Sequence, residues 1–146
     1  MKGSAHRRIA ACGIAALAAA LALPAPAAAT YASGWDVAQL THNSVTDSGV
    51  SLAGDRAVWE AAGGTDGGAD LEIFTWTPVT GVVQLTQNSL QDRFPAVSGD
   101  RVAWLQDDGS DWEVWMWRPA GGDLQLTNDS VDEMEPQVSE GLHVWL

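Results

Sequence analysis

Four acidic side chains lie within one short stretch of the chain and have the chemistry of metal ligands. They are Asp107, Asp108, Asp111 and Glu113, in the segment DDGSDWE. Ca²⁺ binds about six to eight oxygen ligands, many of them from carboxylates. The spacing differs from that of an EF-hand loop, and an Asp-Gly hairpin with solvated acids fits the same residues. We therefore interpret the stretch as an ordinary acidic turn and expect no cofactor, with a calcium site on these four residues as the alternative.

Tryptophan side chains are the second group that could contact a ligand, for example by stacking on sugar rings. Several recur in register, as Trp59, Trp104 and Trp145 in one set and Trp76 and Trp117 in another. Recurrence favours packing between repeated units, since each ring buries up to about 250 Å². Trp112 has Leu71 in its place in the preceding copy, so Trp112 is the candidate ligand-contact residue.

Catalytic patterns are not found in the sequence. It contains no G-x-S-x-G elbow, no H-E-x-x-H pair and no glycine-rich phosphate loop. Beyond residue 29 the histidines are His42 and His143. We interpret the first as a polar loop residue and the second as a histidine tolerated in a strand. The sequence therefore predicts no enzyme.

The elements that would position these residues are repeated along the chain. The tripeptide Gln-Leu-Thr begins at Gln39, Gln84 and Gln125, with spacings of 45 and 41 residues. A period in this range is typical of a propeller blade made of four strands. No stretch after residue 29 has the period of a helix, so the sequence predicts an all-β fold.

Each repeat is expected to form one four-stranded antiparallel blade. The expected blades span residues 49–86, 94–127 and, incompletely, 135–146, with a lone outer strand at 35–41. In the central blade the expected strands are residues 94–98, 101–106, 112–118 and 123–127. The blade at 49–86 has four extra residues in its hairpin at 63–68, where a loop tolerates insertion. The segment from Asp66 to Glu72 repeats part of the acidic pattern, with Asp66, Asp70 and Glu72.

The N-terminus has the pattern of a secretory signal peptide over residues 1–29. Lys2, Arg7 and Arg8 precede an apolar run at 9–23, and small residues follow it. Cleavage is expected before Thr30. An uncleaved membrane anchor is the alternative, but the run is shorter than the roughly 20 residues that span a bilayer. The expected location is the periplasm or the outside of the cell.

Charge and cysteine content narrow the range of partners. All 19 acids lie after residue 29, with only four basic residues, so the mature chain has a net charge of −15. Such a surface repels the phosphates of nucleic acids and anionic membranes. The single cysteine, Cys12, lies in the expected signal peptide. The mature chain therefore has no disulfide, and its stability must come from packing.

Residues 35–146 resemble the TolB-type β-propeller repeat family. The resemblance is carried by Gln-Leu-Thr, then Asp92 and Pro95, then the segment VSGDRVAW, an Asp-Gly hairpin and an aromatic strand. Two departures are Val50 in place of the proline and EGL at 140–142 in place of Gly-Asp-Arg. The family's propellers have six blades, which implies roughly 250 residues. About 2.7 blades are encoded here, so the expected structure is an incomplete arc, most economically a piece of a longer propeller.

The function expected from these patterns is that of an exported binding or scaffold module. A protein partner or a polysaccharide would be its ligand, and the open faces of the end blades would favour self-association. One alternative is a remnant of a secreted hydrolase in which the propeller handled substrate. Another is a calcium-dependent glycan-binding module.

Overall fold

Strands account for all of the regular secondary structure in the described part of the chain. The computed structural model describes residues 28–30, 36–63, 69–139 and 141–146, which contain twelve strands and no helix. The prediction of an all-β fold is therefore confirmed. The chain divides into two compact units, residues 1–38 and 39–146. In the first unit, β1 (Ala28–Thr30) pairs antiparallel with β2 (Asp36–Ala38).

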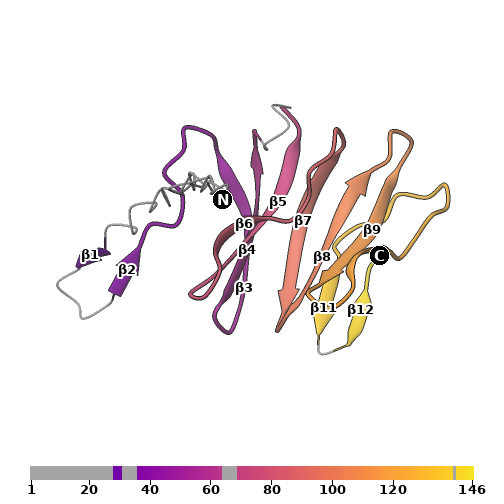
Figure 1. Cartoon of the computed structure of the whole chain (residues 1–146). Helices are drawn as coiled ribbons and strands as arrows, with labels where there is room; N and C mark the ends of the chain where they lie inside the picture. The colour runs from indigo at the N-terminus through magenta and orange to yellow at the C-terminus, as the bar shows by residue number, and fades with distance from the viewer. Residues whose placement is uncertain (1–27, 31–35, 64–68, 140) are drawn as a thin grey trace, which may run out of the picture. The chain divides into compact units, whose positions relative to one another are not determined.

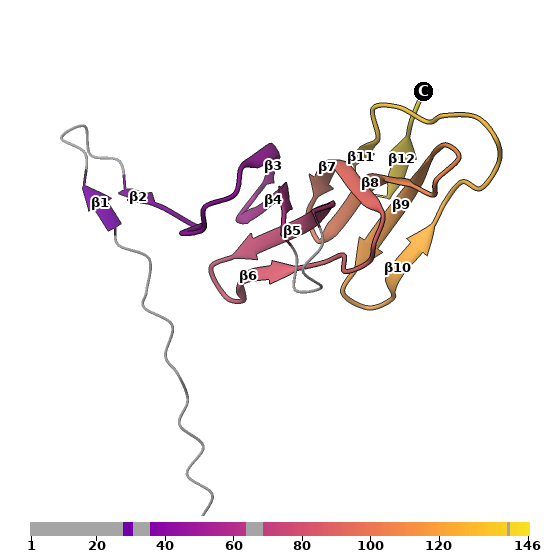
Figure 2. The ribbon, with the colours of Figure 1, turned by 90° about the horizontal axis from the view of Figure 1, so that it is seen from above.

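The second unit consists of two four-stranded antiparallel sheets and a hairpin (Figures 1 and 2). The first sheet contains, in order, β3 (Asp47–Ala53), β4 (Arg56–Ala62), β5 (Leu71–Thr77) and β6 (Gly81–Gln84). The second sheet contains, in order, β7 (Gln91–Ser98), β8 (Arg101–Asp107), β9 (Trp112–Arg118) and β10 (Gly122–Gln125). The C-terminal hairpin is β11 (Gln137–Ser139) paired with β12 (Leu142–Val144).

A backbone bulge recurs in the first strand of each four-stranded sheet. The register shifts between Ser48 and Ser51 in β3, and again between Arg93 and Ala96 in β7. The residues at this point of the three repeats are Gly49, Phe94 and Glu135, with φ of 61°, 55° and 49°. Positive φ is costly for Phe and Glu but not for Gly. A bulge absorbs the proline that follows in two of the copies, since an extra unpaired residue needs no ladder hydrogen bond.

The bulge and the Thr side chains correct the predicted strand boundaries. The first strand of the second sheet was predicted to begin at Phe94 but begins at Gln91, because pairing continues on both sides of the bulge. The fourth strand was predicted to end at Thr127 but ends at Gln125. Beyond Gln125 a side chain takes the place of the backbone acceptor, because the Thr127 hydroxyl accepts a hydrogen bond from the Val114 N–H at 2.8 Å. Thr86 accepts the equivalent bond in the first sheet.

The main core lies between the two four-stranded sheets. Val58 and Ile73 of the first sheet pack against buried residues of β7 and β8, including Trp104. Trp59 belongs to a second cluster, on the other face of the first sheet. Both tryptophans are 5% exposed or less, and for Trp104 the predicted packing between repeated units is confirmed. Trp59 is buried against its own sheet and Leu40. Trp145, the third member of that set, is 39% exposed.

The N-terminal prediction concerns residues that are largely outside the described part. Residues 1–27 lie outside it, so the expected signal peptide is described only at Ala28 and Ala29. Both are in β1, and the expected cleavage before Thr30 would fall inside that strand. Among the described residues, no helix has the length and apolar character needed to cross a membrane.

Candidate functional site

The hairpin between β8 and β9 brings three of the four predicted metal ligands together. Asp108, Asp111 and Glu113 each place a carboxylate oxygen within 4.8 Å of the other two. Asp108 is exposed, whereas Asp111 is 7% exposed and Glu113 is fully buried. Asp107 is not part of this group. Its Oδ1 accepts a hydrogen bond from the Gly109 N–H at 2.8 Å and shapes the turn.

Hydrogen bonds to the backbone hold two of these carboxylates in place by one oxygen each. Asp108 Oδ1 accepts from the Ser110 N–H at 2.8 Å and from the Asp111 N–H at 3.3 Å. Glu113 Oε1 accepts from the Asp129 N–H at 2.9 Å. Such bonds to a charged acceptor are stronger than those between neutral groups. The carboxylates are therefore oriented by the fold before any ligand arrives.

The remaining oxygens of the two buried acids lack a donor. Both carboxylate oxygens of Asp111 and Oε2 of Glu113 have no hydrogen-bond partner. Burial raises the pKa of the Asp111 carboxyl, and the charges of Asp108 and Glu113 raise it further. Buried polar groups are normally hydrogen-bonded, and an exception calls for an explanation such as an ion.

A second source of acidic side chains is the segment that leads into the C-terminal hairpin. Asp132 Oδ1 accepts from the Trp112 N–H at 3.1 Å, and the Glu133 N–H donates to the Trp112 carbonyl at 3.0 Å. Glu133 is 6% exposed, and its Oε2 has no hydrogen-bond partner. Burial raises the pKa of the Glu133 carboxyl, with a further contribution from the charge of Glu113. This segment therefore adds negative charge beside the hairpin.

The first sheet contains a partial copy of the acidic arrangement. Asp70 and Glu72 stand 41 residues before Asp111 and Glu113, and each has a buried oxygen without a partner. Burial raises the pKa of Glu72 to about 7, although the Asn88 N–H donates to its Oε1 at 2.9 Å. Asp66, the third acid expected in this copy, lies outside the described residues.

A hollow of about 640 Å³ lies beside the acidic hairpin, between the second sheet and the C-terminal hairpin. Trp112, the predicted ligand-contact residue, is half-buried in its wall. Phe94 contacts Trp112 edge-on, with ring centroids 6.4 Å apart, and is itself 50% exposed. The wall residues are Phe94, Leu105, Trp112, Asp132, Glu133, Met134, Glu135, Pro136 and Gln137. The wall therefore combines apolar and acidic side chains, and none of these residues is basic.

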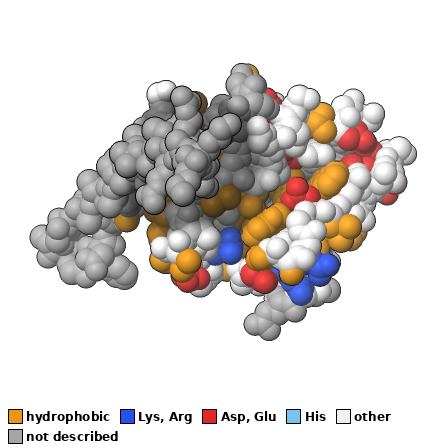
Figure 3. Space-filling view, in the orientation of Figure 1, with side chains coloured by type: hydrophobic (Ala, Val, Ile, Leu, Met, Phe, Trp, Pro, Cys, Tyr) orange, Lys and Arg blue, Asp and Glu red, His pale blue; other side chains and the backbone are white. Residues whose placement is uncertain are grey.

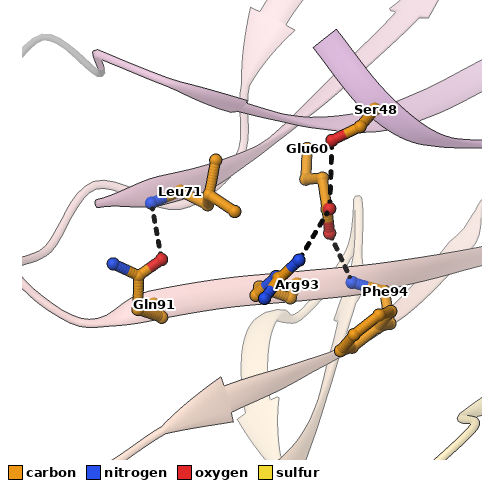
Figure 4. Close-up of polar contacts among 6 residues, drawn as sticks. All are labelled: Ser48, Glu60, Leu71, Gln91, Arg93 and Phe94. Carbon is orange, nitrogen blue, oxygen red and sulfur yellow. Dashed lines mark hydrogen bonds and ion pairs between the residues drawn. The ribbon is translucent and has the colours of Figure 1, made fainter. Parts of the chain in front are cut away.

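The equivalent place between the first and second sheets is closed by a buried carboxylate (Figure 4). Glu60 Oε2 accepts from the Phe94 N–H at 2.7 Å, and its Oε1 accepts from the Ser48 hydroxyl at 3.1 Å. Arg93 approaches Glu60 Oε1 to 3.7 Å. Leu105 of the second sheet occupies the position equivalent to Glu60, 45 residues later. It has no carboxylate that could accept a hydrogen bond from the backbone at Glu135, the residue equivalent to Phe94. We attribute the open hollow to this replacement.

The two histidines do not join these groups. His42 lies in the wall of a smaller hollow on the first sheet. Burial lowers the pKa of His143, and the charge of Arg101 lowers it further. The predictions for them as loop and strand residues fit these positions, since His143 is in β12.

Sequence reasoning missed Glu60, Glu133 and Phe94. Alignment of the repeats was the signal that could have pointed to Phe94 and Glu133. Phe94 occupies the repeat position of Gly49, and Glu133 occupies that of Asp92. On the face shown in Figure 3, hydrophobic and acidic side chains share the surface of the described residues. Compared with known proteins, the chain matches no family model and no curated protein.

Proposed function

We propose that this chain is an exported, non-catalytic binding module of the β-propeller type that contacts a protein partner through the hollow beside Trp112. The observation that carries the proposal is the hollow itself, whose wall holds the half-exposed Phe94 ring in contact with the half-buried Trp112 ring. Aromatic side chains at the centre of a concave surface are the usual anchors of protein recognition.

The propeller assignment rests on repetition in three dimensions. Two sheets have the same strand order and the same bulge, and their core faces pack on one another. The Gln-Leu-Thr motif also has a repeated role. The amide groups of Gln39 and Gln84 donate to the carbonyls of Thr41 and Thr86, at 2.7 and 2.8 Å. These features support the proposal that the two sheets are blades of a propeller, and the TolB-type assignment is proposed from the sequence motifs.

Charge indicates what kind of partner fits the hollow. Asp132, Glu133 and Glu135 line it together with apolar groups. A segment with alternating basic and apolar side chains would complement this wall, because a guanidinium group can pair with carboxylates and also lie over an aromatic ring. The chain already contains such a contact, with the Arg93 guanidinium 4.9 Å from the centre of the Phe94 ring. The proposed ligand is therefore a basic, apolar segment of a protein.

Export is proposed from the N-terminal sequence pattern, and its test is direct. Sequencing the N-terminus of material recovered outside the cytoplasm should find Thr30 as the first residue. A membrane-bound product that retains Met1 would contradict export by cleavage.

The binding proposal can be tested with labelled peptides on the purified chain. Fluorescence polarisation would compare a peptide of alternating arginine and leucine with its glutamate analogue and with neutral oligosaccharides. The arginine peptide should bind, and Trp112→Ala should weaken it by about tenfold or more, as loss of a central aromatic anchor does. Phe94→Gly should also weaken it, while the glycine suits the positive φ at the bulge.

Leu52→Ala is the matched control, because Leu52 is 72% exposed on β3 and lies outside the hollow. The affinity of this variant for the arginine peptide should equal that of the unchanged chain. Equal binding by all three variants would overturn the assignment of the hollow. Binding of oligosaccharides without binding of the arginine peptide would replace the protein partner with a polysaccharide.

A further inference from the structure

The acidic hairpin has features that the proposed binding function does not use. Asp111 and Glu113 are buried, and three of their four carboxylate oxygens have no hydrogen-bond donor. An acidic turn made only for solubility would leave these oxygens in water, where they cost nothing. Burial without donors therefore points to a ligand that supplies positive charge.

Positive charge is not supplied by the protein in the described residues. Within the described part of the chain, no Lys or Arg lies within 4.0 Å of the carboxylates of Asp108, Asp111 or Glu113. The ion pair found there joins Arg93 and Glu60. The segment before β11 adds further carboxylates to the surroundings. Neighbouring carboxylates raise one another's pKa unless a cation offsets their repulsion. The group is thus arranged for a cation that comes from solution.

The chemistry of the group selects among cations, and its size is compatible with Ca²⁺. All three ligands are carboxylates, which suit hard ions such as Ca²⁺ and Mg²⁺, whereas zinc sites are usually built from nitrogen and sulfur. Oxygens on opposite sides of Ca²⁺ are about 4.6–5.2 Å apart, given bonds of about 2.3–2.6 Å. The carboxylate oxygens here lie within 4.8 Å of one another. Mg²⁺ requires a tighter and more regular octahedron.

We propose that Asp108, Asp111 and Glu113 bind one Ca²⁺ ion in the hairpin between β8 and β9. Asp111 and Glu113 supply buried oxygens, and Asp108 supplies an oxygen at the exposed side, where water completes the coordination. Ca²⁺ then ties the hairpin to the segment that carries Asp129, because Glu113 already accepts the Asp129 N–H with its other oxygen. The site does not depend on the partner proposed for the hollow.

Calcium alone is the probe, titrated into the full chain after treatment with a chelator. Isothermal titration should show saturable binding with a Kd in the range of extracellular calcium modules, about 0.1–1 mM. Bound Ca²⁺ should also raise the melting temperature, since a ligand of the folded state stabilises it. Mg²⁺ at the same concentration should produce a smaller rise.

Asp111→Asn and Glu113→Gln should each weaken calcium binding by about tenfold or more. Neither change removes a hydrogen bond that the fold needs. The Asp111 carboxylate makes none, and a glutamine in place of Glu113 would keep an acceptor for the Asp129 N–H. Asp107→Asn is the matched control in the same hairpin. It removes the same charge but keeps the acceptor for the Gly109 N–H, so calcium affinity should change by less than about threefold.

Three results would overturn the site. One is a lack of saturable binding across the stated range. Another is an equal loss of affinity in Asp107→Asn and Asp111→Asn, which would mean that Ca²⁺ responds only to the general negative field. The third is a rise in melting temperature that is as large with Mg²⁺ as with Ca²⁺, and as large in Asp111→Asn as in Asp107→Asn. That result would mean that the ions only screen the net charge.

Discussion

Buried carboxylates of the same chemical type have different surroundings in this chain. Asp92 is fully buried and accepts hydrogen bonds from Trp104, Gln106 and Asn88, at 2.7, 2.9 and 2.7 Å. Glu72 is equally buried, but its Oε2 has no partner. The first arrangement stabilises the packing of Trp104, whereas the second leaves an ionised group that is costly to bury.

Stability should therefore depend on pH through Glu72. Its pKa is about 7 in the folded chain against 4.5 for the ordinary carboxyl, mainly because of burial. The folded state holds this proton more tightly than the unfolded state, so stability falls as pH rises from about 4.5 to 7. The loss is at most about 3 kcal/mol, and less where solvent screens the group.

Glu72→Gln should reduce this fall, because glutamine stays neutral and keeps an acceptor for the Asn88 N–H. Urea midpoints at pH 5 and pH 7.5 would measure the difference. Asp100→Asn, in the exposed turn between β7 and β8, is the control and should leave the pH dependence unchanged. A fall of equal size in the unchanged chain and in Glu72→Gln would contradict the assignment to Glu72.

At the scale of elements, β7 is the strand that joins the sheets. It packs against β3, β4 and β5 of the first sheet and against β11 of the C-terminal hairpin. Its bulge places the Phe94 N–H toward Glu60 on one side and the Phe94 ring toward the hollow on the other. One backbone irregularity thus serves both the contact between sheets and the candidate binding surface.

Glu60→Ala should destabilise the fold by about 2–3 kcal/mol, because it leaves the Phe94 N–H without its acceptor. Glu60→Gln should cost about 1 kcal/mol or less, since the amide oxygen can still accept the Phe94 N–H and the amide NH₂ can donate to the Ser48 hydroxyl, while the ion pair with Arg93 is lost. Denaturant unfolding would measure both free energies. Equal costs would show that the charge of Glu60, and not its hydrogen bond, holds the two sheets together.

At the scale of the whole molecule, apolar side chains are exposed on the first sheet and near the C-terminus. Val50 and Leu52 of β3 are 68% and 72% exposed, and Trp145 and Leu146 are 39% and 78% exposed. Exposed apolar surface on strands favours association with other molecules. The net charge of −15 expected after cleavage opposes it.

We expect the purified protein to self-associate, and to do so more strongly in high salt. Salt screens the repulsion between copies, since the Debye length falls from about 10 Å at 0.1 M to about 3 Å at 1 M. Light scattering across protein concentration and salt would measure the mean mass. Leu52→Lys should reduce the mass, whereas Val79→Lys, in the turn after β5, adds the same charge and should not. A monomer at all concentrations would contradict the prediction.

The candidate sites were predictable from sequence only in part. The acidic stretch and Trp112 stand out by residue type and by their departure from the repeat. Sequence alone did not separate Asp107, which shapes the turn, from Asp108, which joins the cluster. Nor did it identify Glu133, whose approach depends on a segment that follows the hairpin by about 20 residues.

The sequence by itself determined the strands of the two four-stranded sheets, apart from their exact ends, and also their hairpins and repetition, because these depend on neighbouring residues. Alternation of side chains selects strands, and glycines such as Gly99 and Gly109 adopt the positive φ that the turns require. The contact of Glu60 with Phe94, the burial of Asp111 and the hollow beside Leu105 were decided by the tertiary structure. Each depends on how one sheet meets the next, and such packing brings together residues whose spacing along the chain carries no local signal.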